Sequence, residues 1–246
     1  MADFHIQPII DLTTGKICGG EVLWRPNGAP LTPELIAELD EDPVTNAAVT
    51  QDSFLFALDV IEQTKGSLWL SINLSCSFLG SGQRLLRGLS KALPDLEAAQ
   101  RSAGKNLVIE ISEKSVSGTN EANFISQLSH HHQIAIDDFG VTDASIGHMM
   151  KMPYSKLKLD RSVVTGCDFD VFKQRFIKAI LAGCHAIGTE VCAEGIETQS
   201  EAAFLKRVGI DHGQGWLWSK AVSREDFLKL AEEQSESRGA DIIDIS

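Results

Sequence analysis

Short apolar runs rich in β-branched residues alternate with longer amphipathic segments along most of the chain. Helical patterns at 121–129 and 170–188 lie between such runs. A parallel crossover needs about a dozen residues and usually a helix, so this alternation predicts parallel pairing. Doubly wound sheets and closed barrels both satisfy the pattern. From residue 67 onward the predicted strands are 67–75, 106–112, 134–139, 155–160, 190–195 and 211–215.

Local signals mark where several helices begin. Thr198 with Glu201 has the spacing of a capping box, and Ser223 with Asp226 has the same spacing with Asp where Glu is usual. The helical segment 170–188 carries an apolar stripe. Its members are Phe172, Phe176, Ile180 and Leu181.

The N-terminal part is less regular. Segments 4–10 and 16–24 flank a turn-like Leu-Thr-Thr-Gly and predict a hairpin. Two helical patterns follow, one around 33–40, with Thr32 as N-cap and Pro33 in the first turn, and one around 45–64.

The organisation indicates one domain. The sequence holds 246 residues, a size that one large α/β barrel commonly reaches. Neither a long linker nor a short repeat interrupts it, so we expect one domain over 1–234. Residues 235–246 give no firm signal and are expected to form a frayed tail.

Composition narrows the class of ligand. Hydrophobic residues make up 43% and charged residues 23%, an ordinary globular balance. The net charge of -12 argues against a DNA partner, because such proteins neutralise many phosphates with Lys and Arg. A small phosphate ester fits only if cations separate it from clustered carboxylates.

The cysteines and the apolar runs indicate a cytoplasmic protein. The five cysteines are scattered, odd in number and without CxxC spacing, which favours reduced, mostly buried thiols. The N-terminus lacks signal-peptide features, and no apolar stretch reaches the ~18 residues that span a bilayer. We therefore expect no membrane partner.

Apolar strands end in polar residues suited to chemistry. The carboxyl ends of barrel strands surround one mouth, whereas an open sheet would spread these side chains along an edge. The sequence therefore predicts a TIM-like (β/α)8 barrel with an irregular N-terminal hairpin. The residues are Glu21, Asn73, Glu110, Asp137 with Asp138, Lys158 with Asp160, Glu194 and Gln214.

Converging carboxylates require compensation, because like charges a few ångströms apart do not all ionise. Carboxylate and amide oxygens suit Mg²⁺ or Mn²⁺ rather than zinc, and Asp137 with Asp138 could flank two ions. Two ions roughly 3.5–4 Å apart can activate a water and stabilise an in-line phosphoryl displacement. Phosphodiester hydrolysis fits this chemistry.

Each piece also has a simpler reading. A pair of Asp residues after a strand is more often a turn or cap, and Lys158 with Asp160 could be an internal ion pair. Glu194 and Glu197 could simply open the next helix. Their joint placement favours the site.

Two further groups carry no firm role. The histidines 130–132 are consecutive, so their side chains point in different directions on a helix, and a solvated helix end explains them best. Trp24, Trp216 and Trp218 could stack on guanine, but barrel packing explains them at least equally well.

At these residues the chain resembles the EAL-domain cyclic di-GMP phosphodiesterases. The resemblance runs from FHIQPIIDLTTGKICGGEVLWR (4–25) to DHGQGWLWSKAVSREDF (211–227). So many ordered blocks make chance similarity improbable. Between these ends the matching blocks are SINLS (71–75), LVIEISE (107–113), IAIDDFG (134–140), MPYSKLKLDRSVV (152–164), AEGIET (193–198) and GIDHGQGWLWSKAV (209–222).

The resemblance implies a metal-dependent hydrolysis of cyclic di-GMP to linear pGpG, with Mg²⁺ or Mn²⁺ in two sites. Lys158 would hold or activate the attacking water, and Glu194 is the other candidate. One ion would lie among Glu21, Asn73, Glu110 and Asp137, and a second among Asp137, Asp138 and Glu194. Substrate contacts would come from Leu23, Arg25, Asp160 and Gln214, with Glu113 and Glu197 supporting the site.

Two departures from the family pattern bear on activity. The Glu-Ala-Leu signature reads Glu21-Val22-Leu23, which is mild. The family sequence DDFGTGYSS reads DDFGVTDAS over 137–145, placing Thr142 at a Gly and Asp143 at a Tyr. The alternative is therefore a weak or silent relative that binds cyclic di-GMP or a regulatory protein partner. The sequence leaves the oligomeric state open between a monomer and a homodimer, the form common among relatives.

Overall fold

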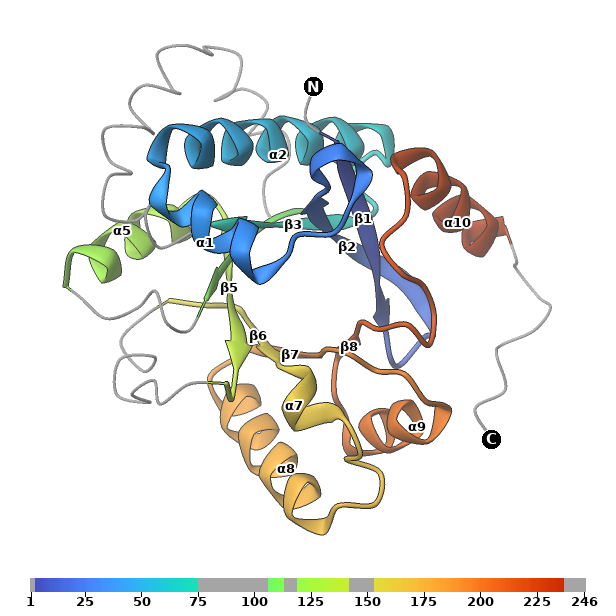
Figure 1. Cartoon of the computed structure of the whole chain (residues 1–246). Coiled ribbons are helices and arrows are strands. Elements are labelled where there is room, and N and C mark those ends of the chain that lie inside the picture. Colours follow the sequence, from blue (N-terminus) through green and yellow to red (C-terminus); the bar gives the residue numbers. More distant parts are fainter. Residues whose placement is uncertain (1–2, 75–105, 113–118, 142–152, 237–246) are drawn as a thin grey trace.

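The strands form a closed barrel. The computed structural model describes residues 3–74, 106–112, 119–141 and 153–236. Within these ranges neighbouring strands pair in chain order and the last pairs with the first (Figure 1). This confirms the barrel and excludes the doubly wound sheet. The strands are β1 (Phe4–Asp11), β2 (Lys16–Trp24), β3 (Trp69–Leu74), β4 (Leu107–Ser112), β5 (Gln133–Phe139), β6 (Lys156–Leu159), β7 (Glu190–Ala193) and β8 (His212–Gly213).

Helices surround the barrel on its outside (Figure 1). The predicted capping box at Thr198 and Glu201 is confirmed in both directions. At the next helix, the Asp226 N–H donates to Ser223 Oγ, whereas the Asp226 carboxylate accepts from the Ser223 hydroxyl. The helices are α1 (Pro33–Glu41), α2 (Pro43–Gln63), α5 (Thr119–Ser129), α7 (Arg161–Val164), α8 (Val171–Ala186), α9 (Gln199–Val208) and α10 (Arg224–Glu236), with a 3-10 turn η1 (Pro26–Gly28).

The predicted N-terminal hairpin is present and reverses one strand of the barrel. β1 runs antiparallel to both β2 and β8, whereas the other neighbouring strands pair in parallel. The start of β1 therefore lies beside the end of β2, at the barrel mouth. Gln7 of β1 stands opposite Glu21 of β2 in this register.

Strand alternation explains how the barrel has an apolar shell and a polar interior. In β6, Leu157 and Leu159 belong to the apolar core between strands and helices. Lys156 and Lys158 alternate with them and, although buried, belong to polar clusters at opposite ends of the strand. Burying each large aliphatic side chain contributes roughly 1.5–3 kcal/mol, so the shell carries the stability and leaves the interior for polar groups.

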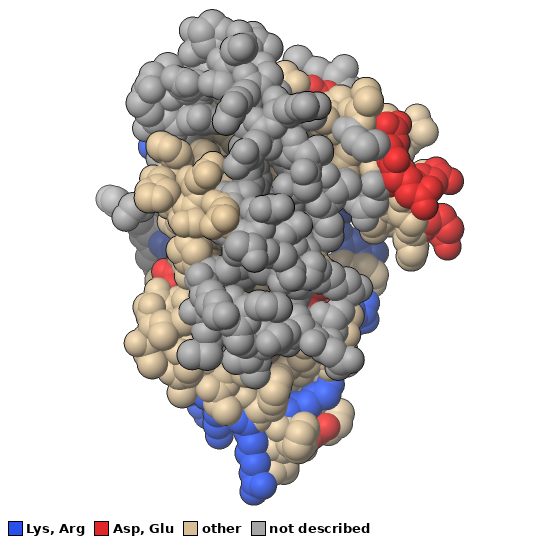
Figure 2. All heavy atoms as spheres, turned by 90° about the vertical axis from the view of Figure 1, so that its left-hand side faces the viewer, with Lys and Arg blue, Asp and Glu red and all other residues tan. Residues whose placement is uncertain are grey.

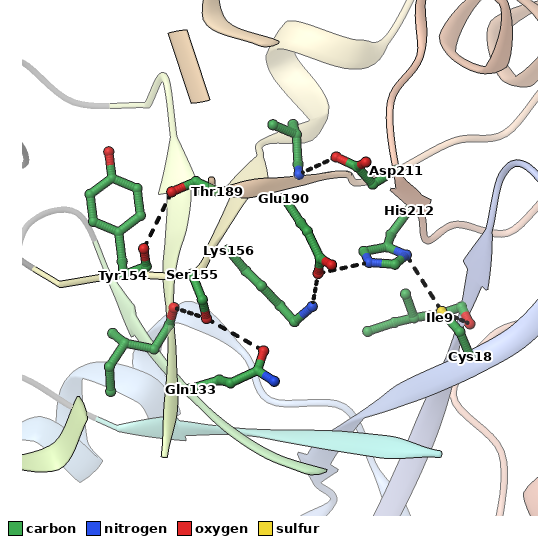
Figure 3. A network of polar contacts seen from close by, with 12 residues as sticks. Ile9, Cys18, Gln133, Tyr154, Ser155, Lys156, Thr189, Glu190, Asp211 and His212 are labelled. Atoms are coloured by element: carbon green, nitrogen blue, oxygen red, sulfur yellow. Dashed lines mark hydrogen bonds and ion pairs between the residues drawn. The ribbon is translucent and has the colours of Figure 1, made fainter. Parts of the chain in front are cut away.

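The end of the barrel opposite the mouth is closed by a polar network that we call the floor (Figure 3). Lys156 forms an ion pair with Glu190, which also lies 3.2 Å from His212 Nε2. His212 Nδ1 lies 3.5 Å from Cys18 Sγ. The Lys156 ammonium also lies 4.6 Å from the ring centroid of Trp69. The buried Lys156 ammonium group is thus neutralised by Glu190 within the floor and does not need the carboxylates at the mouth.

The apolar stripe expected on α8 packs only in part: Leu181 is buried and Ile180 packs against the core, but Phe172 and Phe176 are exposed. Phe172 is 78% exposed and Phe176 38% exposed, whereas Ile177, Leu181 and Cys184 are buried. Hydrophobicity alone did not reveal which side of this helix meets the barrel. In Figure 2 basic side chains gather at the lower end of the molecule, where Figure 1 places α8, a helix with three basic and no acidic residues.

The remaining expectations on single residues have mixed outcomes. Cys167, Cys184 and Cys192 are buried free thiols, and Cys18 is partly buried. His130 and His131 are exposed as expected, but His132 is buried against Phe54, so the expectation of a solvated end was wrong there.

The last expectations concern the C-terminal tail, several residues outside the described ranges, and membrane-spanning helices. The predicted tail begins too early, because α10 continues to Glu236. Cys76, Glu113, Thr142, Asp143 and residues 237–246 lie outside the described residues. Among the described residues, no helix combines the length and the apolarity needed to cross a bilayer.

Candidate metal centre

A single buried ammonium group stands among carboxylates from four different strands at the mouth. Lys158 Nζ lies 2.7 Å from Glu110 Oε2 and 2.7 Å from Glu194 Oε1. It also lies 3.2 Å from Asp137 Oδ1 and 3.4 Å from Glu21 Oε2. Residues predicted from the ends of β2, β4, β5, β6 and β7 therefore meet in one cluster, as barrel geometry requires.

Amides orient the Glu21 carboxylate. Asn73 Nδ2 donates to Glu21 Oε1 at 3.0 Å, and Gln214 Nε2 donates to Glu21 Oε2 at 2.7 Å. Gln214 Nε2 also lies 3.1 Å from Gln7 Oε1. The sequence-based prediction missed Gln7. Its signal was a polar side chain between Ile6 and Pro8 in β1, which the hairpin register places opposite Glu21.

A β-bulge brings two consecutive aspartates to one site. The β5–β6 register shifts between Ile136 and Phe139, and Asp138 adopts a left-handed φ of 58°. Consecutive residues of a regular strand point to opposite faces, so this break is what turns both carboxylates toward the mouth. One oxygen each from Asp137, Asp138 and Glu194 lie within 4.8 Å of one another.

Burial and mutual repulsion determine the protonation of the cluster. Burial raises the pKa of Glu194 to about 8 and that of Glu110 well above its usual range, with neighbouring carboxylates adding to both effects. Burial also opposes charging of Glu21, but Lys158 and the amide hydrogen bonds lower its pKa overall. Burial lowers the pKa of Lys158, yet the four carboxylates raise it well above normal.

The donor set fits divalent cations. Five carboxyl groups face one ammonium group, which leaves an excess of negative charge if all ionise. Asp137 Oδ1 is buried without a hydrogen-bond partner, although it lies within ion-pair distance of Lys158. Carboxylate and amide oxygens are the ligands that Mg²⁺ and Mn²⁺ prefer, so added positive charge would satisfy these groups.

Other predicted residues lie around the cluster. Burial lowers the pKa of Arg25 and the charge of Glu21 opposes this shift; Arg25 Nη1 donates to Trp24 O at 3.1 Å. Leu23 is partly buried near the end of β2. Asp160 accepts from the Ser162 N–H at 2.7 Å and so caps α7, whereas Lys158 pairs with the carboxylates of the cluster.

Glu197 lies at the edge of the same region and is exposed. Its Oε1 is 3.5 Å from Arg161 Nη2, and both side chains are open to solvent. Such an exposed pair contributes little stability, on the order of 0–1 kcal/mol. The residue is thus available for a ligand but is not drawn into the cluster.

The fold and the site define a closed barrel protein whose mouth carries an acidic, amide-lined cluster of oxygen ligands that could hold a cation. The chain belongs to the EAL domain family, which matches residues 2–221. EAL domains are metal-dependent, and the acidic cluster described above could bind metal.

Curated relatives from Escherichia coli strain K12 are cyclic di-GMP phosphodiesterases. The probable cyclic di-GMP phosphodiesterase PdeB is 28% identical over 93% of this chain and 44% of its own length. The cyclic di-GMP phosphodiesterase PdeL is 27% identical over 91% of this chain and 63% of its own length. The chain therefore spans only part of these relatives.

Solved structures agree with the fold. The EAL enzyme Bd1971 in its cAMP- and cyclic di-GMP-bound form is 29% identical with a TM-score of 0.75, over 93% of this chain and 64% of that one. An EAL domain protein from Listeria monocytogenes EGD-e is 25% identical with a TM-score of 0.76, over 94% and 92% of the two chains.

Proposed function

We propose that this protein is a metal-dependent phosphodiesterase that hydrolyses cyclic di-GMP to linear pGpG. The observation that carries the proposal is the Lys158 ammonium group within 3.4 Å of four carboxylates from four strands. Membership of the EAL family and the relatives' activities support the choice of substrate.

The proposed cofactor is a pair of Mg²⁺ or Mn²⁺ ions. When bound, the ions would supply positive charge that lowers the pKa of a water and stabilises charge on the phosphate. One ion would be held by Glu21, Asn73, Glu110 and Asp137. The other would be held by Asp137, Asp138 and Glu194.

Lys158 and Glu194 have complementary roles in this proposal. Lys158 stays charged among its carboxylates, so it would donate a hydrogen bond to hold the attacking water and would not take its proton. Glu194 would accept that proton. The water oxygen then bonds to phosphorus and the bond from phosphorus to the ribose 3′ oxygen breaks. The proton that Glu194 accepted passes to that oxygen through solvent, so it leaves as a hydroxyl and Glu194 is ionised again.

Substrate contacts are assigned to residues around the cluster. Arg25 would pair with a phosphate, because a guanidinium matches its geometry. Gln214 would present Oε1, which is buried without a hydrogen-bond partner. Leu23 and Asp160 would complete the contacts, and Glu197 would support the site, as would Glu113, which lies outside the described residues.

The direct test is to incubate the purified protein with cyclic di-GMP and either Mg²⁺ or Mn²⁺, and to follow pGpG by chromatography. We expect product that depends on protein and metal and disappears with EDTA. Absence of product at high protein concentration, with cyclic di-GMP binding retained in calorimetry, would overturn the enzymatic proposal.

That negative outcome would favour the second candidate, a silent EAL protein that binds cyclic di-GMP or a regulatory protein partner. Its support is the departure at Thr142 and Asp143, outside the described residues. A Thr142→Gly/Asp143→Tyr double variant would then gain activity if this loop is the defect. A homodimer also stays a proposal, checked by light scattering.

A further inference from the structure

The loop that follows β8 is fixed rigidly at the mouth. Ile196 N donates to Gln214 O at 3.1 Å, and Leu217 N donates back to Ile196 O at 3.0 Å. Gly215 approaches this backbone so closely that a Cβ there would lie 2.0 Å from Ile196 O. The loop after β8 and the loop after β7 are therefore interlocked by two backbone hydrogen bonds and a close backbone approach.

Both ends of this loop are tied to the cluster. Gln214 donates to Glu21 at one end of the loop. At the other end, two residues beyond Leu217, the Ser219 carbonyl accepts from Gln7 Nε2 at 3.2 Å. Gln7 in turn contacts Gln214. The segment between Gln214 and Ser219 is thus held over the β8–β1 side of the mouth.

Within this fixed segment one large aromatic side chain is turned outward. Leu217 and Trp218 pack against the apolar core, as does Trp24, but Trp216 is 60% exposed. The Lys220 ammonium lies 4.5 Å from the Trp216 ring centroid. Barrel packing therefore accounts for Trp24 and Trp218 and does not account for Trp216.

We propose that Trp216 is a stacking platform for a guanine base of the substrate, with Lys220 adding positive charge beside it. This inference rests on the proposed function. An exposed indole on a backbone segment fixed at the mouth offers a base the π-face opposite Lys220 at little entropic cost. Arg25, directly after β2, would engage a phosphate from the other side of Glu21. Trp216 thereby determines affinity for the base and takes no part in bond cleavage.

The test compares three substitutions at one position. Trp216→Ala removes the ring, Trp216→Leu keeps apolar bulk without a π-face, and Trp216→Phe keeps a smaller ring. Phe172→Ala is the matched control, because it removes an exposed aromatic residue from α8. For each protein, KM and kcat are measured with cyclic di-GMP and Mn²⁺, and the Tm is recorded.

We expect Trp216→Ala to raise KM by roughly 5- to 150-fold, the range that base–aromatic stacking gives on alanine substitution. Trp216→Leu should behave like Trp216→Ala, whereas Trp216→Phe should recover most of the affinity. The kcat, the Tm and the Phe172→Ala control should stay near wild type. An unchanged KM in Trp216→Ala, or equal KM values for the Leu and Phe variants, would overturn the platform.

Failure of the proposed function would look different. If the wild-type protein yields no pGpG, the same variants are titrated with cyclic di-GMP by calorimetry. A weaker Kd in Trp216→Ala and Trp216→Leu than in Trp216→Phe would then support the platform in a protein that only binds. An equal Kd in all variants would overturn the platform independently of turnover.

Discussion

Lys158 and Glu110 form a buried ion pair at 2.7 Å, with the two residues 3% and 2% exposed. Glu110 alone could not keep its charge at this depth, since burial raises its pKa well above normal. The neighbouring carboxylates raise this pKa further, whereas Lys158 lowers it, so the charge of Glu110 depends on a cation that three other carboxylates share.

Replacing Lys158 separates its catalytic and structural contributions. Lys158→Met leaves buried carboxylates without their cation, so we expect the free energy of unfolding to fall by about 3–5 kcal/mol and turnover to fall at least about 100-fold. Urea unfolding and pGpG formation measure the two effects. Lys156→Met is the control, because it removes a buried ammonium from the floor; it should lose stability and keep kcat within a few fold. Equal kcat losses in the two variants would contradict the assignment.

Removing Glu21 tests the metal centre. Glu21→Ala should abolish turnover, with a loss of at least about 100-fold, and should weaken Mn²⁺ binding in calorimetry, because it deletes an oriented oxygen ligand. The circular dichroism spectrum should stay unchanged. Glu190→Ala at the floor removes a carboxylate remote from the mouth and should leave Mn²⁺ affinity intact. A Glu21→Ala protein with the wild-type rate would refute the ligand assignment.

Substituting alanine for two glycines should change the free energy of unfolding in opposite directions. Gly215→Ala places a Cβ 2.0 Å from the Ile196 carbonyl, so the interlocked loops must separate, at a cost of about 1–3 kcal/mol or more. A Cβ at Gly183 in α8 meets no heavy atom within 4 Å, and Gly183→Ala should stabilise by about 0.5–1 kcal/mol. Thermal unfolding of both variants checks this, and a stable Gly215→Ala protein would show that the loops are not interlocked.

The buried His132 should make the free energy of unfolding decrease as the pH becomes acidic. Burial lowers its pKa from 6.5 to about 4, so between these values the unfolded chain binds a proton that the folded protein rejects. The contribution is complete above pH 6.5 and is lost as the pH falls toward 4, by at most about 3 kcal/mol. Urea unfolding at several pH values should show a shallower slope in His132→Gln. His130→Gln, an exposed control, should retain the wild-type slope.

The sequence was sufficient to predict the barrel and most of its centre, because strands end where apolar runs give way to polar residues. Glu194 directly follows β7 and obeys this rule, whereas Glu21 and Glu110 lie inside the carboxyl-terminal halves of β2 and β4; all three meet as expected. Asp138 does not follow from it, since alternation would have turned it away from Asp137. Its place depends on a bulge and a left-handed φ, which involve pairing with a distant strand.

Other differences also arise from tertiary contacts. Gln7 acquires its place only through the register of the hairpin. The buried face of α8 is chosen by the surface beneath it, so Phe172 is exposed although it is more hydrophobic than buried Cys184. His132 follows two exposed histidines, yet it is the one that Phe54 covers.

The reversed direction of β1 has a practical consequence for anyone who attaches a label to this protein. Because Phe4 pairs with Trp24, the amino-terminal end of the barrel enters at the rim that carries Arg25, and only two residues lie between Phe4 and Gln7. An affinity tag or fluorescent protein joined ahead of β1 would hang beside the cluster and could obstruct ligand entry. Attachment beyond α10 leaves that rim clear.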